Sequence, residues 1–422
     1  MQKLRHNLYN NDMQESSRYA VGIDIGTTAV RIVVGQIEYE NNNPIITIVG
    51  VAKAPNSGLR KGVVVNLAGP GQATDEALGE VERISGHKID DATISINGAH
   101  ILTTKTDGMI AAGNIDHEIT HEDVERLKDV ATVGKIPANR EILGVIPHAY
   151  KLDGQDGIKD PVGMTGTRLE VNAHVVSALT PYIENLRKVS EGLELVPSNI
   201  IVSGIAAAEA VLNESQKENG VALVDIGGST TNVVVYEDGD LQYVGIIPIG
   251  GINITNDLAI GLKTDPQVAE KIKVEHASAL RRKENSGISI KDGDKIHSFQ
   301  TDEIDDIVEA RLEELFEHIE NELKKAGRAG RLPSGIVLTG GSADLKGLVD
   351  YTKNSLNLSA RVGVLPEYSG VGEEYNTPEY ASAFGLMLID NNSARTGYKN
   401  TSSLSENKKN GVISKIMKKF RV

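Results

Sequence analysis

The sequence contains no cysteine and no tryptophan, and only 4% of its 422 residues are aromatic. Without cysteine, the chain can form neither disulfides nor thiolate metal sites, which fits a reducing cytosol. No run of 18 or more residues is apolar, and the N-terminus lacks the apolar segment of a signal peptide, so we expect no membrane-spanning helix. The net charge of −14 argues against general nucleic-acid binding.

Apolar residues are nevertheless plentiful. They make up 40% of the chain, which is enough for sizeable cores, and these cores must be mostly aliphatic because aromatic residues are so few. The length predicts more than one domain, since a single domain usually holds ~100–200 residues.

One stretch, residues 223–236, reads as an apolar run, an acid, a short turn and a second apolar run. This pattern predicts a β-hairpin. Glycines in the turn let successive N–H groups converge on one anion, hydroxyls add donors, and an acid at the strand end can hold water on a divalent cation. The residues concerned are Asp225, Gly227, Gly228, Ser229 and Thr230. For one turn by itself, an ordinary polar hairpin is the simpler interpretation.

The pattern occurs a second time, roughly 200 residues earlier, in residues 19–37. The corresponding residues are Asp24, Gly26, Thr27 and Thr28. Two acid–Ile–Gly turns between β-branched strands imply duplicated lobes that face one ligand.

A third glycine turn lies within residues 336–348. A predicted strand ends there in Gly340 and Gly341, and Ser342 is placed to N-cap a helix whose dipole favours phosphate. The three turns in this order resemble the actin-like ATPase superfamily, with its two phosphate hairpins and its adenosine loop.

This resemblance implies an α/β fold of two lobes, built on duplicated ribonuclease H-like domains. It also implies ATP in the cleft and Mg²⁺ near Asp24 and Asp225, held through water. Sugar kinases and heat-shock chaperones share the fold, so the fold does not settle the function.

Further residues of the cleft follow from the same resemblance. Glu209, on a helix predicted over 203–212, stands where a residue can orient the attacking water, although a solvated helix carboxylate explains it equally well. Glu270 and Lys273 lie at i,i+3 on a predicted helix that reaches the ribose and base in the superfamily, and a surface ion pair explains this spacing equally well. Ser229 replaces a common third glycine and Asn232 a common aspartate, so the resemblance implies at most weak ATPase activity.

Residues 88–177 depart from actin and predict a compact α+β insertion. Its helix opens with Thr120-x-x-Asp123, a variant of the capping box. Residues 118–127 and 140–176 resemble the inserted subdomain of the FtsA family, the bacterial cell-division actin homologues, and the likeness extends over 19–388. In that family the subdomain contacts neighbouring protomers and later division proteins and carries no chemistry. We therefore interpret Gly154, Gly157, Gly163 and Gly166 as turn residues.

A smaller outer subdomain is expected over 277–327. It begins in a basic, irregular stretch over 276–298 and continues in a long acidic helix over 303–323. In the FtsA family this subdomain binds the acidic C-terminal tail of FtsZ, and the cluster Arg281-Arg282-Lys283 suits such a tail. A solvated charged face is the simpler interpretation of the cluster.

The C-terminal end changes composition twice. Residues 390–410 are rich in Asn, Ser, Thr and Lys, which predicts a flexible linker. Residues 411–422 predict a basic amphipathic helix that lies on a membrane surface, with a docking helix or an unstructured tail as the alternatives. Its apolar face would hold Val412, Ile413, Ile416, Met417 and Phe420, and its basic face Lys415, Lys418, Lys419 and Arg421.

The expected organisation is a disordered extension (1–17), a first lobe (18–87, 178–211, 370–389), the insertion (88–177), a second lobe (212–276, 328–369), the outer subdomain (277–327), the linker and the terminal helix. The resemblance implies an ATP-binding, polymerising protein that tethers FtsZ filaments to the cytoplasmic face of the membrane at the septum and recruits later division proteins. The alternatives are a sugar or acetate kinase, which needs a substrate base that we do not find, and an actin-like scaffold of pilus assembly.

Overall fold

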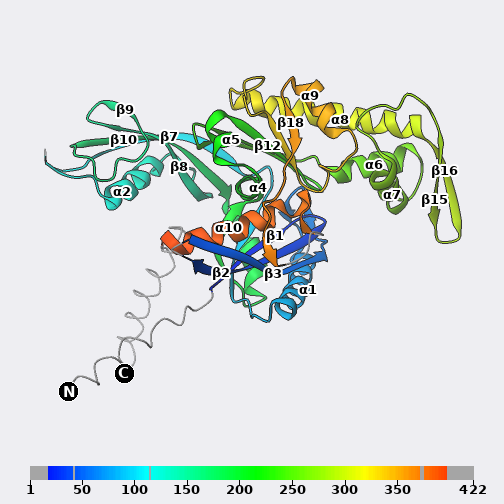
Figure 1. Cartoon of the computed structure of the whole chain (residues 1–422), viewed down its shortest axis with the longest axis horizontal. Helices are drawn as coiled ribbons and strands as arrows, with labels where there is room; N and C mark the ends of the chain where they lie inside the picture. The colour runs from blue at the N-terminus through cyan, green and yellow to red at the C-terminus, as the bar shows by residue number, and fades with distance from the viewer. Residues whose placement is uncertain (1–17, 41–42, 114–115, 371–374, 397–422) are drawn as a thin grey trace, which may run out of the picture.

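A computed structural model describes residues 18–40, 43–113, 116–370 and 375–396. The predicted N-terminal extension over 1–17 and the predicted membrane helix over 411–422 therefore lie outside the described residues. Two large sheets form the middle of the described chain, and a third sheet projects to the left in Figure 1.

The first lobe is built on a six-stranded sheet in the order β11-β6-β1-β2-β3-β19. The strands are β1 (Arg18–Ile25), β2 (Ala29–Glu40), β3 (Asn43–Pro55), β6 (Asp91–Ile96), β11 (Val196–Val202) and β19 (Ser369–Gly370). Helix α1 (Ala68–Ser85) covers one face and α10 (Ala381–Thr396) the other (Figure 1). Because both faces are covered, β1 is buried on both sides and reads as a nearly continuous apolar run. Smaller elements are β4 (Leu59–Arg60), β5 (Val63–Val64), α3 (Thr180–Glu191) and the 3₁₀ turn η2 (Pro378–Tyr380).

The second lobe is built on a five-stranded sheet in the order β14-β13-β12-β17-β18. The strands are β12 (Val221–Ile226), β13 (Thr231–Glu237), β14 (Asp240–Ile247), β17 (Ile336–Thr339) and β18 (Ala360–Val362). Alternate residues of β12 enter two different cores: Leu223 packs with the first lobe, and Val224 packs with the core of α8 (Thr301–Lys325). This alternation is the period of two expected of a strand buried on both faces.

Two helices lie between the sheets and join the lobes. Helix α10 packs on β1, β2 and β6 of the first sheet, while α4 (Ser203–Val211) packs on β12 and β13 of the second. The two helices also pack against each other, so closely that Gly385 of α10 lies directly against the backbone carbonyl of Ala206 in α4. The two helices therefore form one layer between the sheets, in which helix backbone lies directly against helix backbone.

The outer part of the second lobe lies at the right of Figure 1. It contains α6 (Gly251–Gly261), α7 (Pro266–His276), the far end of the long helix α8 and a hairpin of β15 (Gly287–Asp292) and β16 (Lys295–Gln300). Helix α9 (Leu348–Leu356) lies beside β18 of the five-stranded sheet. The predicted helix over 303–323 is confirmed. The prediction of an irregular stretch over 276–298 is wrong, because Gly293 takes a positive φ and turns the chain into this hairpin.

The inserted subdomain has a four-stranded sheet in the order β7-β10-β8-β9, with one helix against it. The elements are β7 (Leu102–Ala111), α2 (His121–Thr132), β8 (Arg140–Leu152), β9 (Gln155–Ile158) and β10 (Arg168–Leu179). The predicted capping box is confirmed, since Thr120 and Asp123 exchange hydrogen bonds at the start of α2. Gly154 and Gly163 lie in turns with positive φ, as predicted. The prediction is wrong for Gly157, which lies inside β9 although its φ is positive, and Gly166 has neither a turn assignment nor a positive φ.

Two predicted boundaries need correction. The insertion does not begin at 88, because β6 pairs with β1 and β11 inside the sheet of the first lobe. The linker does not begin at 390, because α10 continues to Thr396 and Asp390 is buried within it. The carboxylate of Asp390 accepts hydrogen bonds from the backbone N–H of Val21 and the hydroxyls of Thr93 and Ser198, at 3.1, 2.8 and 2.7 Å. These partners from three strands satisfy a buried charge that looks like linker composition in the sequence.

Candidate functional site

A cavity of about 540 Å³ lies between the two lobes. Its walls come from the turn of β1–β2, the turn of β12–β13, the start of α6, helix α7, the turn after β17 and the segment before α10. Fourteen residues were predicted to hold nucleotide or metal, and thirteen of them line this cavity; Ser229 does not. The thirteen are Asp24, Gly26, Thr27, Thr28, Asp225, Gly227, Gly228, Thr230, Glu270, Lys273, Gly340, Gly341 and Ser342.

The first two turns have the same geometry. The N–H of Gly26 donates to the carbonyl of Ala29 at 3.1 Å, and the N–H of Gly227 donates to the carbonyl of Thr230 at 2.9 Å. In both hairpins the acid and the glycine lie just before the turn, so the two acids enter the cavity from opposite lobes. The similarity predicted from the sequence is thus present in the backbone.

Close backbone packing explains the glycines of the second turn and its neighbours. The first N–H groups of α6, from Gly251 and Ile252, donate to the carbonyls of Gly227 and Gly228 at 2.9 and 2.7 Å. A Cβ at Gly250 would lie only 2.5 Å from the carbonyl oxygen of Gly227. Gly250 is the N-cap of α6 and Gly251 its first residue, so this helix begins directly behind the second turn and supports it.

The third turn corrects a prediction. Ser342 does not N-cap a helix: its N–H donates to the carbonyl of Ile226 at 3.1 Å, and α9 begins only at Leu348. Gly340 has φ +83°, and a Cβ there would lie 2.4 Å from Oδ1 of Asp225. The turn is therefore a backbone loop fastened to β12, and it brings Gly341 and Ser342 to the cavity without a helix dipole.

The two acids are buried and share one electrostatic environment. Burial raises the pKa of Asp24. Burial, and then the charge of Asp24, raises the pKa of Asp225 to about 6, although Nδ2 of Asn232 donates to Asp225 at 2.9 Å and opposes this shift.

These acids fit a hydrated divalent cation. No group of three or more potential metal-ligating side chains occurs in the described part of the chain, so two carboxylates can hold Mg²⁺ only if water fills its remaining positions. Oδ1 of Asn232, buried beside Asp225, has no hydrogen-bond partner among the residues that the structure describes and is available to such water. The donor set therefore fits the Mg²⁺ that the sequence predicted.

Several residues of the cavity were missed in the sequence. Arg31, only 8% exposed, pairs with Glu379 at 2.6 Å, and Lys53 pairs with the same carboxylate at 2.9 Å. All three line the cavity, as do Asn97 and Ser203. Arg31 was the one that could have been found, because the predicted hairpin places it directly opposite Asp24.

Glu209 is not brought to the cavity. Its carboxylate accepts from Nζ of Lys217 at 3.0 Å, on the side of α4 that faces α5 (Glu214–Asn219). Ser203, at the first position of α4, lines the cavity instead. The helix was predicted correctly, but Glu209 lies six positions further along it and on another face.

Glu270 and Lys273 on α7 both line the cavity and also pair with each other at 2.7 Å. Nζ of Lys273 donates to Oγ1 of Thr255 at 2.9 Å, which ties α7 to α6. The two interpretations offered from the sequence, a place in the cleft and an ion pair, are therefore both correct for Glu270 and Lys273. Contact of either residue with a sugar stays a prediction.

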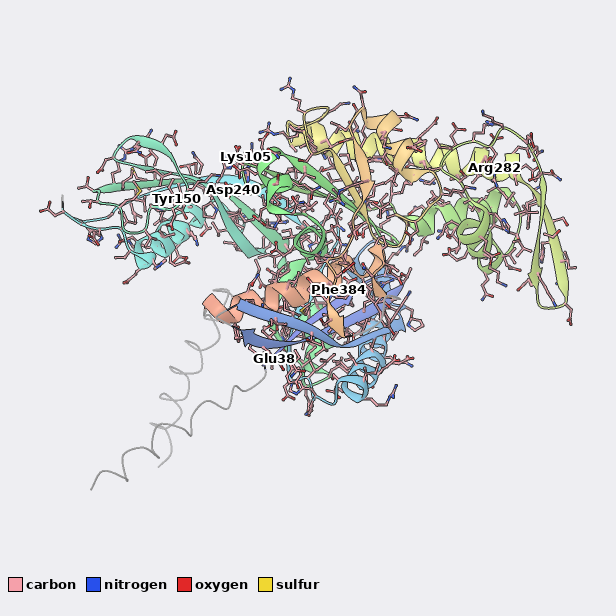
Figure 2. The ribbon with its side chains drawn as sticks, in the orientation of Figure 1. Glu38, Lys105, Tyr150, Asp240, Arg282 and Phe384 are labelled. Carbon is pink, nitrogen blue, oxygen red and sulfur yellow. The ribbon has the colours of Figure 1, made fainter. Side chains whose placement is uncertain are left out.

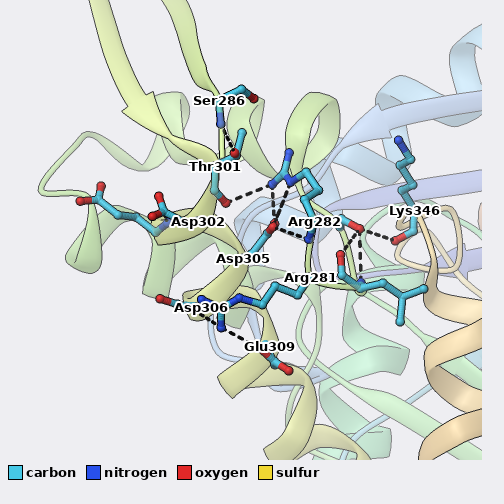
Figure 3. Close-up of polar contacts among 12 residues, drawn as sticks. Arg281, Arg282, Ser286, Thr301, Asp302, Asp305, Asp306, Glu309 and Lys346 are labelled. Carbon is cyan, nitrogen blue, oxygen red and sulfur yellow. Dashed lines mark hydrogen bonds and ion pairs between the residues drawn. The ribbon is translucent and has the colours of Figure 1, made fainter. Parts of the chain in front are cut away.

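The basic cluster of the outer subdomain is largely occupied by acids of α8 (Figure 3). Arg282 binds the buried carboxylate of Asp305 through its guanidinium and its backbone N–H. Arg281 pairs with Asp306 at 2.8 Å and lies 3.8 Å from Glu309. Among the three, Lys283 is exposed and forms no ion pair within the described residues.

The inserted subdomain contacts the second lobe along β14. Oγ1 of Thr103 accepts from the backbone N–H of Val244 at 3.2 Å, and Nζ of Lys159 pairs with Asp240 at 2.6 Å. Figure 2 places Asp240 at this junction. The insertion is thus attached to both lobes, through the chain to the first and through side chains to the second.

The family models that match the chain are described as cell division protein FtsA, over residues 222–385, and as the SHS2 domain inserted in FtsA, over residues 98–177. Among curated proteins, the cell division protein FtsA of Pseudomonas aeruginosa is 35% identical over 378 residues, which is 89% of each chain. The FtsA of Bacillus subtilis is 34% identical over 379 residues, 89% of this chain and 84% of that protein.

Solved structures with a similar fold include the PilM–PilN complex of type IV pilus biogenesis, with a TM-score of 0.63, 18% identity and coverage of 88% of this chain and 98% of that chain. MreB5 of Spiroplasma citri bound to ADP has a TM-score of 0.52 and 13% identity, and covers 89% of this chain and 98% of its own. These likenesses show the fold alone. None of the described helices combines the length and the apolar character needed to cross a membrane.

Proposed function

The chain belongs to the FtsA family of actin-like cell division proteins, and from this premise we propose that it binds ATP with Mg²⁺ between its lobes, polymerises, and tethers FtsZ filaments to the membrane. The observation that carries the nucleotide part of the proposal is the pair of matching turns, each with a buried acid, at opposite walls of one cavity.

The cavity offers a distinct task to each kind of residue. The glycine turns present backbone N–H groups and hydroxyls to the phosphates. Arg31 and Lys53 pair with Glu379 and Lys273 pairs with Glu270, and the remaining N–H groups of these cations would donate to a polyphosphate. Asp24 and Asp225 would hold Mg²⁺ through water, and the ion would neutralise phosphate charge when bound. Glu270 and Lys273 on α7 would face the sugar.

ATP turnover is proposed to be weak at most. The residue at the start of α4 is Ser203, and its neighbours in the cavity wall are the amides Asn97 and Asn232. These groups can orient water but are poor proton acceptors, and the carboxylate of Glu209 is engaged elsewhere by Lys217. A weak ATPase suits a protein in which the nucleotide controls assembly.

Mg-ATP affinity should depend on pH through Asp225. Its pKa is raised to about 6, so below that pH a proton occupies the carboxylate that the hydrated cation needs. We expect affinity to fall about tenfold for each pH unit below this value and to level off above it. Titration of a fluorescent ATP analogue from pH 5 to 8 measures this. Asp225→Asn is the control, because residue 225 can no longer titrate in this variant while ATP itself still does. If affinity falls with pH equally steeply in the wild type and in the variant, the pH dependence does not come from Asp225.

The membrane part of the proposal rests on the C-terminal residues. All six charged residues from Lys408 onward are basic, whereas the whole chain has a net charge of −14. The four basic residues of the predicted helix would contribute roughly 1 kcal/mol each near anionic lipid. Partial burial of five apolar side chains adds to this, less the cost of ordering a short helix. One copy would therefore bind weakly, and copies linked in a polymer would gain avidity.

Co-sedimentation with anionic liposomes tests this tether. We expect the full chain to pellet with the liposomes, more strongly with ATP, and a chain that ends at Asn410 to stay in the supernatant. If both forms stay in the supernatant, the membrane proposal is wrong. If a polymerisation-blocked monomer binds as tightly as the wild type, avidity does not control attachment.

The partners that we propose are those of the FtsA family. The outer subdomain would bind the acidic tail of FtsZ, with Lys283 as the cation of the basic cluster that α8 leaves available. The inserted subdomain would contact neighbouring protomers and later division proteins. The site of action would be the cytoplasmic face of the cell membrane at the septum.

A further inference from the structure

The side-chain amide of Asn97 lies between the start of α4 and the second turn. Asn97 directly follows β6 and lines the cavity. Its Nδ2 donates to Oγ of Ser203, the first residue of α4, at 2.8 Å, and to Oγ1 of Thr230, in the second turn, at 3.2 Å. The two protons of one amide nitrogen are therefore shared between two hydroxyls that also line the cavity.

The direction of these two bonds is fixed by a third. Oδ1 of Asn97 accepts from the backbone N–H of Gly98 at 2.8 Å, and a backbone N–H can only donate. The amide cannot be turned over, because its NH₂ group would then face this N–H. An amide nitrogen is a donor and not an acceptor, so neither hydroxyl can give its proton to Nδ2. Ser203 and Thr230 are therefore the acceptors in their bonds with Asn97.

Ser203 accepts from a second amide as well. Nδ2 of Asn232 lies 3.4 Å from Oγ of Ser203 and also donates to the carboxylate of Asp225 at 2.9 Å, which fixes the orientation of this amide too. A hydroxyl has two lone pairs and one proton, and both lone pairs of Ser203 face amide donors. The proton of Ser203 must therefore be given to some other group.

The hydroxyl protons of Ser203 and Thr230 are available to a ligand. Within the described part of the chain, neither proton has an acceptor. Each of the two residues is only 4% exposed, and buried hydroxyls normally form all the bonds open to them. Because both side chains line the cavity, an oxygen-rich anion bound there would supply the missing acceptors.

We propose that Asn97 is a positioning residue that directs the hydroxyl protons of Ser203 and Thr230 to the terminal phosphate of ATP, so that the site prefers ATP to ADP. This inference rests on the proposed ATP site. Asp225, which shares the amide of Asn232 with Ser203, is proposed to hold the cation, and such a cation bridges the last two phosphates of a nucleotide. The position of Ser203 at the N-terminus of α4 also favours negative charge beside it.

Titration with Mg-ATP and Mg-ADP tests this role. We expect Asn97→Ala to weaken Mg-ATP binding about 10-fold, the order of one charge-assisted hydrogen bond, and to change Mg-ADP binding by less than about 2-fold. The double variant Ser203→Ala/Thr230→Val should lose about 100-fold for Mg-ATP, since both donors are removed. Adding Asn97→Ala to the double variant should change nothing further, because Asn97 acts only through the two hydroxyls. A further loss in this triple variant would overturn the proposal.

A second readout needs no nucleotide. In the NMR spectrum of the full chain, the two Nδ2 protons of Asn97 give separate resonances, which are identified by their loss in Asn97→Ala. We expect Ser203→Ala to shift one of them and Thr230→Val the other, because each proton is bonded to a different hydroxyl. If neither variant shifts them, Asn97 does not orient the hydroxyls and the inference is overturned. If the wild type binds neither nucleotide, the proposed function fails. If it binds both and Asn97→Ala weakens them equally, only the inference fails.

Discussion

Replacing Gly385 by alanine is expected to lower the free energy of unfolding by about 3 kcal/mol or more, or to prevent folding, because the contact of α10 with α4 has no room for one methyl group. A Cβ at this position would lie 1.7 Å from the carbonyl oxygen of Ala206 and 2.4 Å from its carbon. The obstacle is helix backbone, which cannot rotate away as a side chain can. Figure 2 shows the neighbouring Phe384 on α10, beside the first sheet.

The matched control is Gly79→Ala on α1, where a Cβ would meet nothing within 4 Å. There the same substitution replaces an exposed helical glycine and should raise stability by about 0.5–1 kcal/mol. Urea unfolding of both variants, followed by circular dichroism, measures the two shifts. A midpoint for Gly385→Ala close to that of the wild type would show that α10 and α4 are not in direct backbone contact.

Replacing Arg282 by alanine is expected to lower the free energy of unfolding by about 1–3 kcal/mol, because it removes the main hydrogen-bond donor of a buried carboxylate while Arg282 itself is partly exposed. Asp305 is only 2% exposed, and three of its bonds come from the guanidinium. Burial opposes ionisation of Asp305, but the hydrogen bonds and charge of Arg282 outweigh it and hold the pKa of the carboxyl below its usual range. Without Arg282, the carboxylate keeps one backbone N–H and is otherwise left buried without a partner (Figure 3).

Arg281→Ala is the control, because Arg281 pairs with exposed acids of the same helix and should contribute less than about 1 kcal/mol. The pH dependence gives a second check. A carboxyl with a lowered folded pKa contributes stability above its unfolded pKa and loses it as the pH falls. The difference between wild type and Arg282→Ala in thermal unfolding should therefore narrow at acid pH. Equal destabilisation by both variants would contradict a special role for Asp305.

Local patterns predicted the hairpins, and distant contacts decided the rest of the site. The two strands of each hairpin, one of which carries Asp24 or Asp225, could be predicted from apolar runs separated by a glycine turn. The ion pair of Arg31 with Glu379 joins residues 348 positions apart, and no local pattern reports such a contact. Thirteen cavity residues were found in advance because the resemblance specified three turns and one helix, whereas Arg31, Lys53 and Glu379 belong to none of these.

Two misassignments show how burial changes the meaning of a polar segment. The sequence around Asp390 predicts a linker, because Asn and Ser follow it. In the structure Asp390 is buried, and its carboxylate accepts hydrogen bonds from hydroxyls of β6 and of the residues of β11 beside it. Ser342 was predicted to be an N-cap because it follows a glycine pair. In the structure its backbone N–H donates to the carbonyl of Ile226, and the next helix begins only at Leu348. By contrast, the hairpin of β15 and β16 had a local signal, Asp292-Gly293 between alternating apolar residues, which was passed over.

The position of α10 bears on how the protein is made. The hydrogen bond between Val21 and Asp390 joins residues 369 positions apart, and α10 covers a sheet whose strands β1, β2 and β3 are synthesised long before it. Until α10 has been translated, one face of that sheet has no helix packed on it. The first lobe therefore cannot finish folding during most of synthesis. The residues proposed to bind lipid are translated after α10. They therefore leave the ribosome only after the helix that completes the first lobe has been made.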